Sequence, residues 1–150
     1  MDVNTREFGT IQVGDDAIYE FPDGVYGFES EKKFAIFSRE IEGFSFLYLQ
    51  SLDNLVPCFL VFEPWDIYSD YQPMVSKEDL DTCQVDNIDD LIFLVIANVP
   101  SKMENLSINI KSPVVLNPKT RKAKQVILQN PDYIVRYFPF LQNGKEGSSC

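Results

Sequence analysis

Histidine is absent from this chain of 150 residues. Its absence excludes Ser-His-Asp triads, histidine general bases and histidine metal ligands. Carboxylate or lysine chemistry survives this exclusion, but no spacing in the sequence marks a specific pair of such groups. We therefore predict a protein that is not an enzyme and that holds neither a metal ion nor a cofactor.

Cysteines and long apolar runs are also scarce. The three cysteines, Cys58, Cys83 and Cys150, are an odd number and form no CxxC pair, so unpaired thiols are favoured over a disulfide or redox role. Residues 1–5 have neither the basic start nor the apolar run of a signal peptide. No apolar run approaches the length of about 20 residues that spans a bilayer. We expect a cytoplasmic protein with no membrane contact.

Basic residues are few in the first 90 positions, which hold 20 acids and 5 bases, a net charge of −15. Residues 91–150 hold 3 acids and 8 bases, a net charge of +5. Ten of the acids lie within residues 53–90, where Lys77 is the one base. Such a field repels nucleic acid and anionic membranes and attracts basic partners. A solvated face that maintains solubility is the alternative interpretation.

Strand patterns dominate what the chain does contain. Eight of the nine residues in 91–99 are apolar, which predicts a strand buried on both faces. Residues 106–111 alternate between apolar and polar and predict a half-buried strand with Leu106, Ile108 and Ile110 facing inward. Residues 100–105 are a plausible hairpin connection between the two. A doubly buried strand beside a half-buried one indicates the middle of an antiparallel sheet.

Further short strands are predicted over residues 10–13, 17–21, 34–37, 44–50, 56–63, 113–116 and 126–128. Glycine, proline, asparagine and aspartate separate these runs, which favours a sandwich or barrel over βαβ units. Ser76 can cap a short helix that carries Glu78 and Asp79 in its first turn. The predicted fold is mostly β, a small antiparallel β-barrel-like single domain over residues 1–141 with one or two short helices. Residues 142–150 are predicted to be a disordered tail.

The loop at residues 21–28 has the residue composition of tight turns. Pro22 presets φ and Gly24 supplies a positive φ, while Gly27 makes a second bend. Phe21 and Phe28 are expected to anchor the two ends of the loop in the core. We favour a structural loop over a binding loop, because phosphate-binding loops carry more glycines and precede a helix.

The segment of residues 63–79 combines aromatics with acids. Its aromatics either close one end of the barrel as core or form a contact surface, since Trp and Tyr are favoured interface anchors. We predict that this segment is the docking site of a protein partner. The predicted contact residues are Glu63, Trp65, Asp66, Tyr68, Asp70, Tyr71, Glu78 and Asp79.

Four bases lie close together at Lys119, Arg121, Lys122 and Lys124, before the predicted strand 126–128. A basic cluster at a hairpin can contact phosphate. With a net charge of −10, a solvated hairpin tip that protects a sheet edge is the better interpretation.

Several of these pieces together resemble the FliW family of flagellar assembly factors. The family has a Phe-Pro-x-Gly-Leu-Pro-Gly-Phe-like loop, and residues 21–28 stand in its place with Val25 and Tyr26 for the usual Leu-Pro. An apolar strand then ends in an acid and proline, here Glu63 and Pro64 where the family usually has Asp. The remaining matches run in the same order to about residue 137: 49–51, 105–106, 112–117, 124–128, Tyr133 and Arg136.

The resemblance implies a small antiparallel barrel-like fold and no catalysis. Proteins similar to FliW bind CsrA, a dimeric RNA-binding translational repressor, away from its RNA site and relieve repression of flagellin mRNA allosterically. Flagellin binds the same family through its C-terminal region and releases CsrA. On this basis the expected partners are CsrA and flagellin, with no direct nucleic-acid binding and a monomer when free. The alternative is a small-ligand or carboxylate-enzyme β-barrel that uses acids such as Glu63 and Asp66 near an open end.

Overall fold

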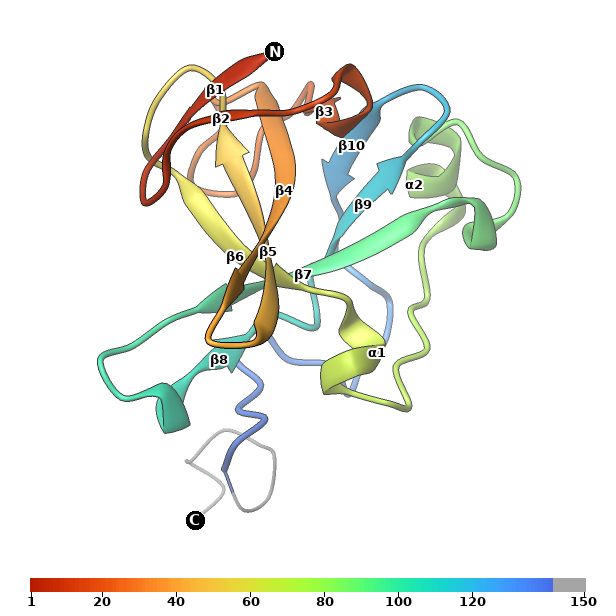
Figure 1. The fold of residues 1–150 in the computed structure, drawn as a ribbon. Helices are drawn as coiled ribbons and strands as arrows, with labels where there is room; N and C mark the ends of the chain where they lie inside the picture. The colour runs from red at the N-terminus through yellow and green to blue at the C-terminus, as the bar shows by residue number, and fades with distance from the viewer. Residues whose placement is uncertain (142–150) are drawn as a thin grey trace.

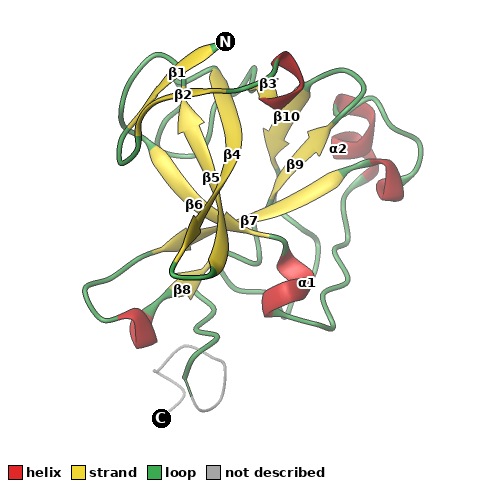
Figure 2. Cartoon of the chain, viewed as in Figure 1, coloured by secondary structure: helices red, strands yellow, loops and turns green. Residues whose placement is uncertain are grey.

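The computed structural model describes residues 1–141, and the predicted tail at residues 142–150 lies outside the described residues. Ten strands and two short helices make up most of the regular structure (Figures 1 and 2). The helices are α1 (Pro64–Ile67) and α2 (Lys77–Thr82), and single 3-10 turns lie at Asp15–Ala17, Ile88–Asp90 and Met103–Asn105. The strands are β1 (Asp2–Thr5), β2 (Gly9–Gln12), β3 (Ile18–Glu20), β4 (Lys33–Ile41), β5 (Phe44–Ser51), β6 (Cys58–Phe62), β7 (Ile92–Asn98), β8 (Ser107–Ile108), β9 (Val114–Asn117) and β10 (Lys122–Gln125).

Seven of the strands form a closed barrel. The order is β6-β5-β4-β3-β10-β9-β7, and β7 pairs again with β6, while β8 is added beside β7. All of these pairings are antiparallel except β3 with β10, which meet in one parallel bridge between Glu20 and Lys122. The prediction of a mostly β, antiparallel barrel-like fold with one or two short helices is confirmed.

The strand β7 is buried on both faces, as its composition predicts. Phe93 and Val95 belong to a core cluster that also contains Tyr71 and Ile110. Leu94, one position along, belongs to a second cluster inside the barrel with Phe21. Because successive side chains of a strand point to opposite faces, β7 joins these two clusters.

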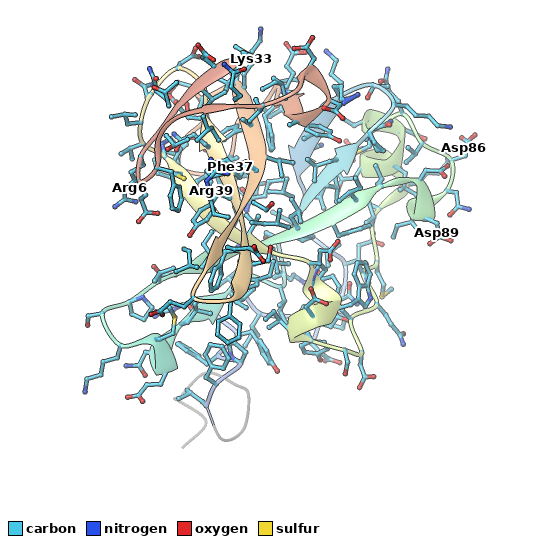
Figure 3. The ribbon with its side chains drawn as sticks, in the orientation of Figure 1. Arg6, Lys33, Phe37, Arg39, Asp86 and Asp89 are labelled. Atoms are coloured by element: carbon cyan, nitrogen blue, oxygen red, sulfur yellow. The ribbon has the colours of Figure 1, made fainter. Side chains whose placement is uncertain are left out.

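The β1–β2 hairpin forms a separate sheet that packs on β4 through a third core cluster. Val3 and Thr5 of β1 are buried and alternate with exposed residues, and no strand was predicted over this segment. The guanidinium of Arg39 lies 5.5 Å from the ring centroid of Phe37 and 5.7 Å from that of Phe8. Figure 3 shows Phe37 and Arg39 on β4 in this part of the molecule.

Two strand predictions are wrong. Residues 126–128 form no strand; the strand instead covers Lys122–Gln125, and the amides of Val126 and Leu128 bond to the carbonyls of Pro113 and Lys111 outside any ladder. Val126 and Leu128 are buried without strand pairing and Ile127 is 55% exposed, an alternation that composition cannot distinguish from that of a strand. In 106–111 only two residues are in a strand, although Leu106, Ile108 and Ile110 are all buried as predicted.

The helix predicted after Ser76 is present as α2. The Ser76 hydroxyl accepts a hydrogen bond from the amide of Asp79 at 3.1 Å, the expected N-cap interaction. The other helix, α1, has Pro64 in its first turn, where a missing N–H is tolerated. No helix within residues 1–141 has the length and apolar character to cross a membrane.

Candidate interaction site

The helix α1 places Trp65 at the surface. The Trp65 side chain is 46% exposed, and its indole N–H donates to the carbonyl of Tyr71 at 2.9 Å. Its ring makes edge contacts with Tyr71 and Phe93, at centroid distances of 5.8 and 5.9 Å. Trp65 therefore packs one side of its ring on the core and leaves the other available to a partner.

The other two aromatics of the predicted segment are more deeply placed. Tyr71 is 2% exposed, donates its hydroxyl to the carbonyl of Ile110 at 2.8 Å, and stacks on Tyr133 at 5.1 Å. Burial raises the pKa of the Tyr71 hydroxyl. Tyr68 is half-buried against Tyr133 and Tyr137. Tyr71 is therefore a core residue, as the first interpretation of the segment predicts, and Trp65 is partly exposed, so its role as a contact residue stays a prediction.

A groove of about 810 Å³ opens beside Trp65. Its walls bring together three acids from three distant parts of the chain, Asp70, Asp89 and Asp132. Apolar side chains line it as well, Trp65, Met74, Ile88, Leu91, Phe93 and Tyr133 among them. We call this site the acidic groove. Figure 3 shows Asp86 and Asp89 at the outer edge of the molecule, on the segment that leads into β7.

The chain that forms one wall of the acidic groove is held by side-chain hydrogen bonds. Asn130 accepts from the amide of Met74 at 2.8 Å and donates to the carbonyl of Gln72 at 2.9 Å. The hydroxyl of Tyr133 accepts from the amide of Gln72 at 2.6 Å. These three hydrogen bonds fix the conformation of this wall of the groove.

The predicted contact residues do not all meet at this groove. Trp65 and Asp70 line it, while Glu63 and Asp66 are exposed on and beside α1. Glu78 and Asp79 lie on α2, outside the lining. Asp132 was not among the predicted contacts; only the packing of residues 130–133 against 72–74 brings it here, so no local signal marks it.

Asp79 has a partner within its own chain. It forms an ion pair with Lys124 at 3.0 Å, with the two side chains 17% and 25% exposed. Burial alone lowers the pKa of Lys124, but the hydrogen bond and charge of Asp79 outweigh it, so the pKa of Lys124 is raised. This ion pair links α2 to β10.

The basic cluster at residues 119–124 is largely engaged with its own chain. Lys122 pairs with Glu20, and Lys124 pairs with Asp79. Arg121 donates to the carbonyl of Asp16 at 2.7 Å. These contacts favour the structural interpretation of the cluster, although Lys122 and Lys124 lie within β10 and not at a hairpin tip.

The loop at residues 21–28 has the predicted positive φ values, +67° at Gly24 and +88° at Gly27. A Cβ atom at Gly24 would lie 2.6 Å from the backbone of Glu29, so the site excludes any side chain. Phe21 is fully buried as expected. The prediction for Phe28 is wrong: it is 37% exposed and packs on Phe59 at the surface, because the Gly27 bend turns the chain outward.

Acids and thiols within residues 1–141 form no cluster of three or more that could hold a metal ion. The two cysteines in this range, Cys58 and Cys83, are free thiols. Burial raises the pKa of Cys58 to about 11, which keeps the unreactive thiol form at neutral pH.

Comparison with known proteins identifies the family. The family model described as FliW protein matches residues 2–139. The chain belongs to the FliW family. It is 32% identical over 149 residues to the flagellar assembly factor FliW of Thermoanaerobacter pseudethanolicus, covering 99% of each chain. It is 37% identical over 136 residues to the FliW of Thermotoga neapolitana, covering 90% of this chain and 91% of that protein. A crystal structure of the flagellar assembly factor FliW superimposes with a TM-score of 0.84 at 27% identity, covering 95% of this chain and 99% of the other.

The residues that carry the FliW resemblance mainly build the barrel. Gln50 is fully buried, accepts from the amide of Arg6 at 2.9 Å, and donates to the carbonyls of Asn54 and Leu55. Asn117 is buried and donates to the carbonyl of Cys83 at 2.9 Å. These two residues of the resemblance therefore hold neighbouring segments on the barrel, whereas Glu63, Asn105 and Arg136 are exposed.

Proposed function

We propose that this protein is a cytoplasmic flagellar assembly factor that binds CsrA through the acidic groove and antagonises the binding of CsrA to flagellin mRNA. The observation that supports this proposal best is the placement of Trp65. It offers an exposed aromatic anchor at the edge of a groove that also holds Asp70, Asp89 and Asp132.

Electrostatics supports the choice of partner. An RNA-binding repressor carries a basic surface, which an acidic groove attracts. Once bound beside the RNA site, the ten acids of residues 53–90 place negative charge near the phosphates and oppose RNA binding at short range. The antagonism therefore requires no overlap between this protein and the RNA.

Flagellin completes the proposed cycle. The C-terminal region of free flagellin binds the protein and releases CsrA, so that flagellin abundance limits its own translation. This partner switch is the part of the proposal that rests on family membership. In the same scheme the protein is a monomer when free and makes no direct contact with nucleic acid.

The proposal is tested with purified protein and CsrA at tens of micromolar, by calorimetry and by gel filtration. We expect heat of binding, a complex peak, and a lower affinity of CsrA for flagellin leader RNA when the protein is present. Added flagellin should restore RNA binding. Absence of both heat and complex would refute the proposed function.

The competing function, a carboxylate enzyme, needs acids held close together in a protected site. Glu63 and Asp66 are both exposed. We therefore propose that the protein does not catalyse a reaction. Turnover in a hydrolase or transferase screen that disappears in Glu63→Gln would contradict this.

A further inference from the structure

The strand pair that closes the barrel is short, and beyond it the two strands leave an opening (Figure 1). Strands β6 and β7 pair only at Val61 with Ile96 and at Phe62 with Val95. Within the described residues 1–141, residues 58–60 of β6 pair with β5 on one edge and with no strand on the other. Ala97 and Asn98 of β7 likewise pair with β8 alone. In Figure 1 the two strands meet near the centre of the molecule and diverge toward the left.

A groove of about 690 Å³ lies over this opening, and we call it the seam groove. Its floor includes Cys58, Phe59 and Leu60 from β6, and Ala97 and Asn98 from β7. Exposed backbone edges of this kind form hydrogen bonds with an added strand in many peptide complexes.

The walls of the seam groove expose apolar side chains. The tip of the β4–β5 hairpin contributes Phe44, which is 69% exposed, together with Ile41. The opposite wall contributes Val99 and Met103, exposed by 50% and 53%. A row of exposed large apolar side chains along one groove is unusual for a surface that faces only water.

The charge of the seam groove differs from that of the acidic groove. Its lining holds one base, Arg6, and two acids, Glu7 and Glu42. Because the lining is nearly neutral, it favours an uncharged segment of a partner. It does not attract a strongly basic segment. A second copy of this chain is disfavoured as the occupant, because each copy carries a net charge of −10.

We propose that the seam groove binds an extended, uncharged and mainly apolar peptide segment of a partner protein, which adds a strand along residues 58–60 and 97–99. The backbone of the peptide bonds to the free edges of β6 and β7, and its alternate side chains pack on Phe44, Val99 and Met103. This surface is separate from the acidic groove, so the inference holds whether or not CsrA docks there.

The probe is a synthetic peptide of about nine residues with alternating valine and threonine, long enough to span a strand of typical length. The control peptide has proline at alternate positions, which removes the backbone donors and keeps the apolar content. Amide hydrogen exchange is followed with each peptide present. We expect the valine-threonine peptide to slow amide exchange at residues 58–60 and 97–99, and the proline control to leave it unchanged.

Two variants test the walls, Phe44→Asp and Val99→Asp, each expected to weaken peptide binding about tenfold by removing apolar contact and adding charge. The matched control is Ile127→Asp, since Ile127 is 55% exposed and does not line the seam groove. Melting temperatures of all three establish that each variant is folded.

Several results would overturn the proposal: no binding of the peptide at millimolar concentration, equal binding of the proline control, or protection at residues 70–74 in place of the seam. Gel filtration gives a further test. A dimer that Phe44→Asp dissociates would assign this surface to self-association and would also overturn it. CsrA binding measured on the same variants separates a failure here from a failure of the proposed function.

Discussion

Two aromatic side chains six residues apart, Trp65 and Tyr71, occupy very different environments. They contact each other directly, yet Trp65 is 46% exposed and Tyr71 is 2% exposed. Tyr71 satisfies the carbonyl of Ile110 in the core. Trp65 uses its N–H to satisfy the carbonyl of Tyr71 and presents its outer face to the acidic groove.

Trp65→Ala should affect both stability and binding. We predict a loss of about 2 kcal/mol in the free energy of unfolding, below the 3–5 kcal/mol typical of fully buried aromatics, because half the ring is already in water. CsrA should dissociate about thirtyfold faster if Trp65 is a hot spot. Trp65→Phe is the control: it keeps an aromatic ring, of smaller area, and loses the hydrogen bond to the carbonyl of Tyr71. Unchanged dissociation of CsrA from a folded Trp65→Ala protein would place the docking surface elsewhere, with the loop around Tyr26 as the next candidate.

Tyr71→Phe should lower stability by about 1–3 kcal/mol at neutral pH, because it leaves the buried carbonyl of Ile110 without a donor. The effect should depend on pH. Burial raises the pKa of Tyr71, so above about pH 10 the unfolded chain loses this proton while the folded protein retains it, and stability falls as pH rises. Denaturant unfolding at pH 7 and pH 10.5 should therefore show a smaller alkaline loss in Tyr71→Phe. An identical alkaline loss in both proteins would contradict this assignment.

At the scale of elements, the 21–28 loop and the helix α2 are each held by one specific local requirement. The loop needs a residue without a side chain at Gly24, where φ is positive and the Glu29 backbone is close. Helix α2 has only six residues, so its position depends on the Ser76 cap and on the Asp79–Lys124 ion pair.

Gly24 and Gly9 form a matched pair for testing the loop. Their φ values are +67° and +66°, but an added Cβ would contact nothing within 4 Å at Gly9 and would clash with Glu29 at Gly24. We predict that Gly9→Ala costs about 1 kcal/mol from backbone strain alone. Gly24→Ala should cost at least about 2 kcal/mol more, as expected when a side chain is forced into a packed site. Equal melting temperatures for the two variants would contradict the clash.

Asp79 and Glu78 form a matched pair on α2. Asp79→Asn removes the part-buried ion pair with Lys124, and we predict a loss of about 1 kcal/mol. Glu78→Gln should change stability by less than about 0.5 kcal/mol, because Glu78 is exposed. Denaturant unfolding measures both. If CsrA binding weakens in Glu78→Gln with stability unchanged, the docking surface extends onto α2.

At the scale of the whole molecule, charge is distributed unevenly. The first 90 residues carry −15 and the remainder +5. Folding brings acids of both parts to one face, since Asp132 lies with Asp70 and Asp89 in the acidic groove. Elsewhere in the fold, bases form ion pairs with acids, as Lys122 does with Glu20. The field near the groove is therefore more negative than a uniform charge of −10 would produce.

Two double variants separate this local field from net charge. Asp66→Asn with Asp70→Asn should slow association with CsrA and flatten its dependence on salt, with little change in dissociation. Asp15→Asn with Asp16→Asn changes net charge by the same amount within the 3-10 turn before β3, away from the groove lining, and should have a smaller effect. Stopped-flow association at two salt concentrations makes the comparison. Equal slowing by both pairs would show that net charge, and not the acidic groove, steers the encounter.

The sequence by itself determined the features that depend on neighbouring residues. The apolar run at 91–99 required a strand buried on both faces, and β7 is such a strand. Ser76 specified the start of α2, and Gly24 and Gly27 specified the bends of the 21–28 loop. These features can be predicted from the sequence because helix caps, turns and strand alternation each depend on residues only a few positions apart.

The tertiary structure alone decided which of the two neighbouring aromatics is core and which is surface. Tyr71 is buried because its hydroxyl donates to the carbonyl of Ile110, 39 positions away, and its ring stacks on that of Tyr133. The third acid of the acidic groove comes from position 132, and the seam groove exists because β6 and β7 separate after two pairs. Such features depend on contacts between residues far apart in the chain, whose geometry is set when the barrel closes and not by any local pattern.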